Sequence, residues 1–204
     1  VNMDYDGPLT FLESDITEQS NSLFQEVRAQ HPIGEDGAFI AGLTYIDTDL
    51  HIQQASTFNA RSAGLPAPLN GLSLRQFNQT GKSWSPFVSV EVPVAERIML
   101  SGSLRYSHER RVGNAISSNV GVFPPTYLPY DLTETRKESL WDYSARIRYE
   151  FSRDAYVYLS YATGTKGGGF VSNDALLLFN IQSGFATFQY DSERARSWEL
   201  GGKF

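Results

Sequence analysis

Strict alternation of apolar and polar side chains is the feature that most constrains what this chain folds into. Along residues 82–92 the even positions from Trp84 onward are apolar and most of the odd positions are serine or glutamate. A period of two places successive side chains on opposite faces of a β-strand. The alternating runs are residues 23–29, 39–45, 82–92, 97–111, 141–150, 157–162 and 198–204. The sequence therefore predicts about seven strands and an all-β fold.

The connections between these runs fall into two classes. Three are short and lie near residues 31–37, 93–96 and 151–154, whereas three are long and lie at about 54–80, 112–137 and 167–193. Long structureless loops are uncommon in a compact soluble domain. An outer-membrane barrel, in contrast, has short periplasmic turns and long extracellular loops. The pattern predicts a transmembrane antiparallel β-barrel segment in the outer membrane of a Gram-negative bacterium.

Aromatic residues mark the predicted outer end of the strands. Each of the three tryptophans is the first outward-facing apolar residue of a run that follows a long connection, and a tyrosine is the last such residue of each run that precedes one. The predicted lipid-interface residues are Tyr45, Trp84, Tyr106, Trp141, Tyr161 and Trp198. Aromatic girdles of this kind flank the apolar band of membrane barrels. A soluble β-sandwich is the alternative, but it needs a second sheet and no such girdle.

Composition excludes several other classes of protein. The longest apolar run, residues 175–179, is far shorter than the roughly 20 residues of a transmembrane helix. The absence of cysteine excludes disulfides, a thiol nucleophile and cysteine zinc sites. A net charge of −6 disfavours nucleic acid as a partner. The three histidines lack metal-ligand spacing, so we expect neither a metal nor a cofactor.

Several segments resemble one family. Residues 156–170, YVYLSYATGTKGGGF, resemble the "YxSYxxGxKxGGF" strand and loop of the TonB-dependent outer-membrane receptors, and residues 197–203 resemble the "ExGxK" strand that follows. Residues 24–28 followed by 39–45 resemble a barrel hairpin of the same family, and residues 100–106 resemble one of its barrel strands. The resemblance implies active import of a scarce small-molecule ligand (a siderophore, vitamin or carbohydrate), energised by TonB through a plug domain, with no catalysis.

The resemblance also implies parts that residues 1–204 do not contain. Members carry a plug domain, a TonB-contacting segment and a larger closed barrel, and the smallest closed bacterial barrels have eight strands. We therefore expect residues 1–204 to be a partial barrel domain of a longer protein. Two alternatives are a passive porin, whose strands would look alike, and an outer-membrane barrel enzyme, which would need a Ser/His or carboxylate cluster at the rim.

Two sets of residues are candidates for function. The aromatic residues of the loop at 167–193 are candidate ligand contacts because they form a large apolar surface: Phe170, Phe179, Phe185, Phe188 and Tyr190. Polar residues on the predicted inner face are lumen-facing candidates: Arg105, Arg146, Arg148, Tyr158, Lys166 and Glu199. The second set either packs as paired charges against the plug or lines a substrate path.

Overall fold

The computed structural model is almost entirely β-strand. It describes residues 2–4, 12–62, 64, 66, 70–121, 129–152, 154–172, 181, 184 and 187–204. The main sheet is antiparallel, and its strands lie in the order β1-β2-β3-β4-β5-β6-β7-β10. Its strands are β1 (Asn2–Asp4), β2 (Leu12–Ile33), β3 (Gly37–Phe58), β4 (Gly71–Ala95), β5 (Ile98–Gly121), β6 (Tyr130–Glu150), β7 (Tyr156–Lys166) and β10 (Glu193–Lys203). A second, two-stranded sheet pairs β8 (Gly169–Phe170) with β9 (Gln189–Tyr190).

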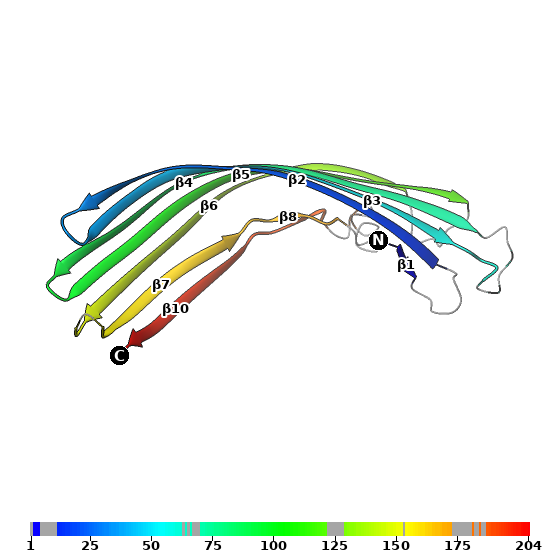
Figure 1. The fold of residues 1–204 in the computed structure, drawn as a ribbon. Coiled ribbons are helices and arrows are strands. Elements are labelled where there is room, and N and C mark those ends of the chain that lie inside the picture. The colour runs from blue at the N-terminus through cyan, green and yellow to red at the C-terminus, as the bar shows by residue number, and fades with distance from the viewer. Residues whose placement is uncertain are drawn as a thin grey trace.

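The main sheet is a curved wall. Figure 1 shows it as an arch, with the short turns between β2 and β3, β4 and β5, and β6 and β7 at one end and β8 beneath the arch. Each long strand pairs with the next long strand in sequence, which is a meander. The predicted all-β antiparallel fold with about seven strands is confirmed, since β1 adds only three residues to seven long strands.

The strands are longer than the alternation predicts. The loops expected at 54–80 and 112–137 are strand over much of their length, because β3 runs to Phe58, β4 begins at Gly71 and β5 reaches Gly121. β3, β4 and β5 remain paired throughout this region, and Gly71 on β4 is in register with both Phe58 on β3 and Gly121 on β5. On the inner face of this extension Phe77, Ala115 and Tyr130 are buried together. That shared burial keeps the strands paired beyond the predicted boundaries.

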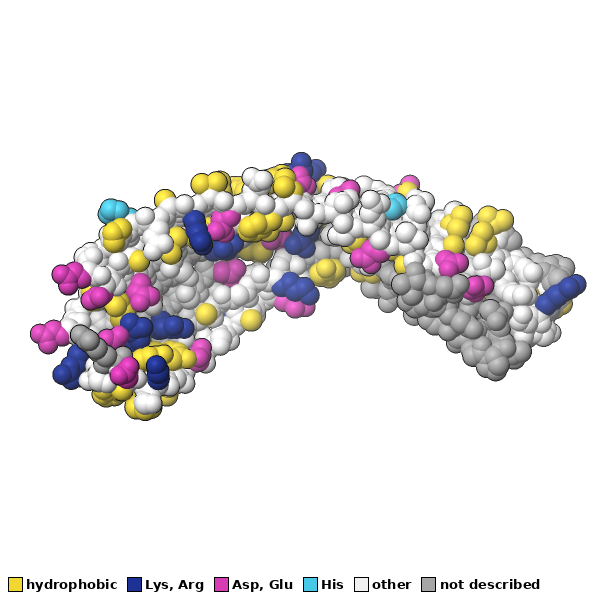
Figure 2. All heavy atoms as spheres, in the orientation of Figure 1, with side chains coloured by type: hydrophobic (Ala, Val, Ile, Leu, Met, Phe, Trp, Pro, Cys, Tyr) yellow, Lys and Arg dark blue, Asp and Glu magenta, His cyan; other side chains and the backbone are white. Residues whose placement is uncertain are grey.

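The two faces of the wall differ in chemistry. The residues that pack against β8 share the polar parity of the long strands, so the polar face is the concave one. Figure 2 shows Lys, Arg, Asp and Glu side chains gathered beneath the arch. The opposite, convex face carries exposed apolar side chains, including Leu43, Val90, Leu104, Ile147 and Leu200. Within the described residues, no helix has the length and hydropathy needed to cross a membrane.

Candidate functional site

The predicted lumen-facing residues all lie on the concave face. Arg146 on β6 places its guanidinium 4.8 Å from the centroid of the Tyr158 ring on β7. The Tyr158 hydroxyl in turn donates a hydrogen bond to Glu199 on β10. Arginine over an aromatic face gains cation–π attraction, and Arg105 and Arg148 make the same contact with Phe87 (5.1 Å) and Tyr156 (5.7 Å). Lys166 is in register with Glu193 at the far end of β7.

The segment that follows β7 folds onto this concave face. Phe170 and Phe188 are only 4% and 1% exposed, and their ring centroids lie 5.1 Å apart. They pack with Phe77, Ala115 and Tyr130 of the wall, where burial raises the pKa of the Tyr130 hydroxyl above its usual value. These two rings therefore stabilise the segment, in contrast to the expected open aromatic surface.

Tyr190 is the described loop aromatic that remains available to a ligand. It is 46% exposed, and its main chain pairs with Gly169 in the β8–β9 ladder. The other two predicted ligand contacts, Phe179 and Phe185, lie outside the described residues.

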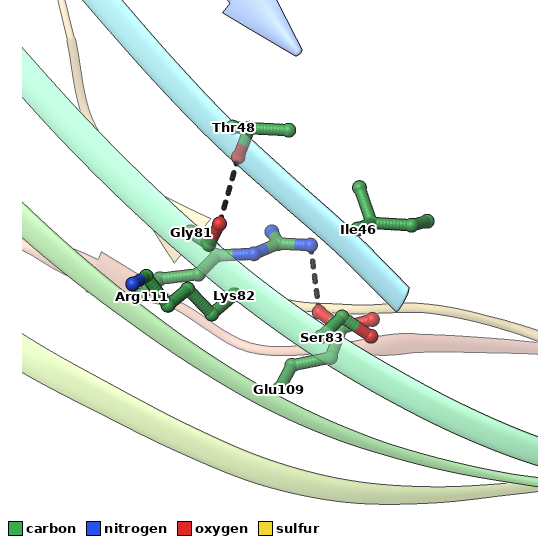
Figure 3. A pocket seen from close by; sticks show the side chains of 7 residues that line it. All are labelled: Ile46, Thr48, Gly81, Lys82, Ser83, Glu109 and Arg111. Atoms are coloured by element: carbon green, nitrogen blue, oxygen red, sulfur yellow. Dashed lines mark hydrogen bonds and ion pairs between the residues drawn. The ribbon is translucent and has the colours of Figure 1, made fainter. Parts of the chain in front are cut away.

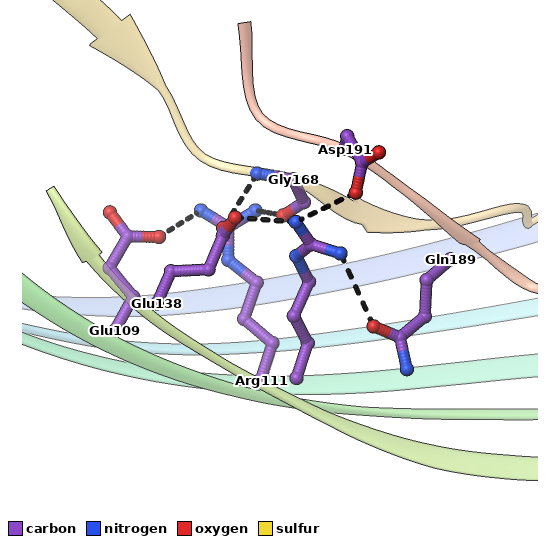
Figure 4. A network of polar contacts seen from close by, with 7 residues as sticks. Glu109, Arg111, Glu138, Gly168, Gln189 and Asp191 are labelled. Carbon is purple, nitrogen blue, oxygen red and sulfur yellow. Dashed lines mark hydrogen bonds and ion pairs between the residues drawn. The ribbon is translucent and has the colours of Figure 1, made fainter.

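A polar network ties the same segment to the wall (Figure 4). Arg111 on β5 donates to the carbonyl oxygen of Gly168 at 2.6 Å, while the amide of Gly168 donates to Glu138 on β6 at 2.8 Å. Both wall residues are paired along their own strands, Arg111 with Glu109 at 2.7 Å and Glu138 with Arg136 at 2.5 Å. One residue of the loop thus bridges a row of arginines and a row of glutamates. Hydrogen bonds to charged groups are among the stronger protein hydrogen bonds.

Arg136 extends the network to β9. Its guanidinium donates to the Gln189 side chain at 3.3 Å, and the Gln189 amide donates to Glu134 at 2.6 Å. Asp191 contributes a longer ion pair of 3.4 Å. The hydrogen bond from Arg136 lowers the pKa of the Glu138 carboxyl, and the same bond raises the pKa of the Arg136 guanidinium. Both groups are therefore charged at neutral pH.

Glycine leaves room where the segment crosses the network, most of all at Gly168, which faces backbone. A Cβ at Gly168 would lie 2.6 Å from Nε of Arg136 and would collide with the carbonyl oxygen of Tyr190, and one at Gly167 would lie 2.6 Å from Oε2 of Glu109. Real Cβ atoms essentially never approach other atoms this closely. The glycines allow the backbone itself to be the group that Arg111 and Glu138 bind.

A small cavity adjoins the network (Figure 3). Its volume is about 100 Å³, and its lining residues are Ile46, Thr48, Gly81, Lys82, Ser83, Glu109 and Arg111. Pockets that hold drug-sized ligands usually measure about 300–1,000 Å³, so this cavity is too small for an import substrate. In the described part of the chain, no group of His, Asp and Glu side chains could hold a metal ion.

The predicted aromatic residues share the convex face. Ring centroids lie 5.5 Å apart for Trp84 and Tyr106, 4.8 Å for Tyr106 and Trp141, and 4.7 Å for Tyr161 and Trp198. Tyr45 is in register with Trp84. We call these six residues the outer aromatic row: Tyr45, Trp84, Tyr106, Trp141, Tyr161 and Trp198. Near the short turns, Tyr149, Phe151 and Phe204 form a second aromatic group.

Sequence reasoning missed the network residues of the wall. Arg111 is the last residue of the predicted strand 97–111 and Glu138 lies between the predicted loop at 112–137 and the run that begins at 141, so the alternation does not show that the two residues share a face. The usable signal was an opposite-charge pair two residues apart on each strand, Glu109 with Arg111 and Arg136 with Glu138. Register then places like charges opposite one another, Glu109 with Glu138.

Comparison with known proteins identifies the family. The family described as TonB dependent receptor-like, beta-barrel matches residues 2–204. The chain belongs to this family. Its fold is similar to that of the ferric yersiniabactin uptake receptor FyuA from Yersinia pestis, with a TM-score of 0.73 at 17% identity over 94% of this chain and 27% of that one.

A second structure of this family has the same fold. The siderophore receptor PiuA from Acinetobacter baumannii gives a TM-score of 0.56 at 15% identity, over 94% of this chain and 29% of that one. The chain thus spans less than a third of the length of either receptor. No curated protein matches the sequence.

Proposed function

We propose that residues 1–204 form part of the wall of a larger outer-membrane β-barrel that imports a scarce ligand with energy supplied through TonB. The observation that carries the proposal is the contrast between the apolar convex face and the polar concave face of the wall. The family match over residues 2–204 supports the same proposal. Exposed apolar side chains on one face fit contact with lipid, and paired charges on the other fit a polar lumen. No step of this function requires a catalytic residue.

The proposed ligand class is a ferric siderophore. One similar structure is named a siderophore receptor and another a ferric yersiniabactin uptake receptor, and the concave wall presents arginines that suit an anionic chelate. The β8–β9 segment lies over the concave face on the side away from the short turns, which is the outer mouth in this proposal. Tyr190, Phe179 and Phe185 are the proposed ligand contacts of this mouth.

Uptake in the presence and absence of TonB tests the proposal. The protein carrying the whole barrel would be produced in an iron-limited host without its own ferric-siderophore receptors. We expect growth on at least one ferric siderophore, and we expect it to stop when TonB is deleted. Uptake that persists without TonB would indicate a passive pore and contradict the proposal.

A pair of variants tests the ligand contact. Tyr190→Ala should weaken siderophore binding by about tenfold, because an exposed aromatic contact often contributes at least 1 kcal/mol to binding. Phe151→Ala is the matched control, since Phe151 is similarly exposed but lies at the opposite end of the wall. Titration of both purified proteins by intrinsic fluorescence gives the affinities. Equal affinities would remove Tyr190 from the proposed site.

A further inference from the structure

The outer half of β6 has an open edge. β7 pairs with β6 only from Ser144 with Ala162 to Glu150 with Tyr156, although β6 begins at Tyr130. On its other side β6 stays paired with β5 as far as Tyr130. The part of the chain that the structure describes supplies no main-chain partner on the β7 side of this stretch.

Side chains separate β6 from β7 where the open edge begins. The main-chain N–H of Tyr143 donates to Oγ1 of Thr163 at 2.9 Å, and this hydroxyl donates to the Tyr143 carbonyl oxygen at 3.3 Å. Arg194 on β10 donates to the carbonyl oxygen of Trp141 at 3.0 Å. These side chains take the place of main-chain bonds at the level of the outer aromatic row. Beyond them β6 continues without β7.

The main chain of four residues points into the open side. Along an antiparallel strand, the N–H and C=O groups of successive residues point alternately to one neighbour and to the other. Those of Tyr143 and the carbonyl of Trp141 point to the β7 side. The exposed residues of the same parity nearer the start of β6 therefore do so as well: Thr133, Thr135, Lys137 and Ser139. We call these four residues the open edge.

The segment that follows β7 crosses the face of β6 and leaves the edge free. Glu138 accepts a hydrogen bond from the amide of Gly168 (Figure 4). Arg136 donates to the side chain of Gln189. Both wall side chains lie on the concave face, so the described parts of the segment do not bind the main chain of the open edge. A further barrel strand would not cover the edge either, because β7 is the neighbour of β6 in the sheet and the free side of β10 is the next place for a strand.

The open edge fits an extended polypeptide. Its N–H and C=O groups recur at about 7 Å along about 20 Å of strand, which is the repeat of another strand's main chain. Prolines and bulges often protect such an edge, but residues 131–141 contain no proline and keep an unbroken register with β5. Added strands are a common mode of peptide recognition.

We propose that the open edge pairs, antiparallel, with an extended segment of another protein outside the membrane. The side chains that stand beside the added strand on the convex face are hydroxyls and one ammonium, so a polar segment fits best. This surface goes beyond the proposed function and depends on it only for placing this end of the wall outside the membrane.

Hydrogen exchange with a strand-forming peptide tests this proposal. The probe is a threonine nonapeptide with glutamate at its centre, which pairs with Lys137 and so sets the register. The protein carrying the whole barrel is held in detergent micelles, and exchange is resolved to single residues. The four amides of the open edge should exchange fast in the free protein. At ten times the Kd of the peptide they should exchange about tenfold more slowly.

A matched pair of methylated peptides shows whether main-chain bonds are responsible. In this register the odd-numbered peptide residues turn their N–H groups toward β6. N-methylation of the third and seventh residues should therefore abolish the slowing, whereas N-methylation of the fourth and sixth should leave it unchanged. Thr135→Pro should also abolish it, because proline removes an N–H of the open edge but no bond to β5. Thr135→Ala is the control and should bind the peptide as the unchanged protein does.

The outcomes separate this inference from the proposed function. Equal slowing by the two methylated peptides, or undiminished slowing in Thr135→Pro, would overturn strand pairing. Slow exchange of the four amides without peptide would show that the protein's own chain covers the edge, or a second copy if it depends on protein concentration, and either result would overturn the external partner. A fluorescent form of the peptide should bind intact cells, and binding only to permeabilised cells would overturn the placement outside the membrane.

TonB-dependent uptake is measured in parallel. Thr135→Pro should retain it, because the open edge takes no part in import. Loss of uptake in the unchanged protein contradicts the proposed function and leaves the peptide results standing.

Discussion

Val88→Arg is the sharpest test of which face of the wall meets lipid. Val88 lies on the convex face, in register with Ala41 on β3 and Leu104 on β5. It is four residues from Trp84, about 14 Å along the strand, and a strand tilt near 40° places it about 10 Å below the outer aromatic row. That depth is close to the middle of an apolar band about 25 Å tall. An arginine there should cost about 2–4 kcal/mol, which lowers the folding equilibrium constant by roughly 30- to 1,000-fold.

Ser89→Arg is the matched control for this substitution. Ser89 is the next residue on β4, but it lies on the concave face, in register with Ile40 and Ser103. An arginine there reaches the proposed lumen, so folding should be nearly unchanged. Reversible unfolding of the whole barrel in lipid vesicles, followed by tryptophan fluorescence and heat-modifiable migration, gives both free energies. Equal destabilisation by the two arginines would refute the assignment of the faces.

Three further predictions concern the anchored β8–β9 segment. Gly168→Ala should displace the segment at a cost of roughly 1–3 kcal/mol, because the new Cβ would lie 2.6 Å from Nε of Arg136. Chymotrypsin should then cleave after Tyr190 faster than in the unchanged protein. Gly164→Ala is the control, because open space surrounds Gly164 and its substitution should not change cleavage. Glu138→Gln should loosen the segment by about 1–3 kcal/mol, measured by hydrogen exchange at the Gly168 amide, and an unchanged exchange rate would contradict the anchor. The pKa of Glu138 is lower in the folded protein than in the unfolded chain, so its contribution to the stability of the segment is complete above the unfolded pKa of about 4.3 and is lost as the pH falls through the folded pKa. Pepsin should therefore cleave the segment faster as the pH falls through this range. Glu138→Gln should remove this pH dependence of cleavage.

The fold was predictable because each strand separates an apolar face from a polar one along much of its length. Side chains between the two aromatic groups alternate with a strict period of two, as Leu100 and Leu104 do against Ser101 and Ser103. The same rule fails beyond the outer aromatic row. There the concave face mixes polar and apolar residues, such as Gly81 and Phe77, and the convex face is largely polar, so periodicity cannot distinguish a strand from a loop. Pairing of adjacent strands, which extends the sheet in this region, leaves no alternation in the sequence.

The position of the β8–β9 segment was less predictable because it contacts β4, β5 and β6, which are distant from it in the sequence. Aromatic residues in a glycine-rich loop indicate an apolar surface, but the sequence does not say whether that surface faces outward or inward. Phe170 and Phe188 turn inward because Phe77 and Ala115 on the concave face offer an apolar patch to cover. Recognising that patch requires knowing that β4 and β5 extend so far. The error in the strand boundaries therefore caused the different expectation for the two rings.

The run of glycines at 167–169 has a physical role that neither turn chemistry nor flexibility alone explains. Arg111 and Glu138 bind the two polar groups of Gly168, and main-chain groups are the same whatever residues follow. Anchoring through the backbone therefore fixes where the segment crosses the wall without restricting the side chains farther along it. A receptor built in this way can change the proposed ligand contacts around Tyr190 while its loop keeps the same attachment to β5 and β6.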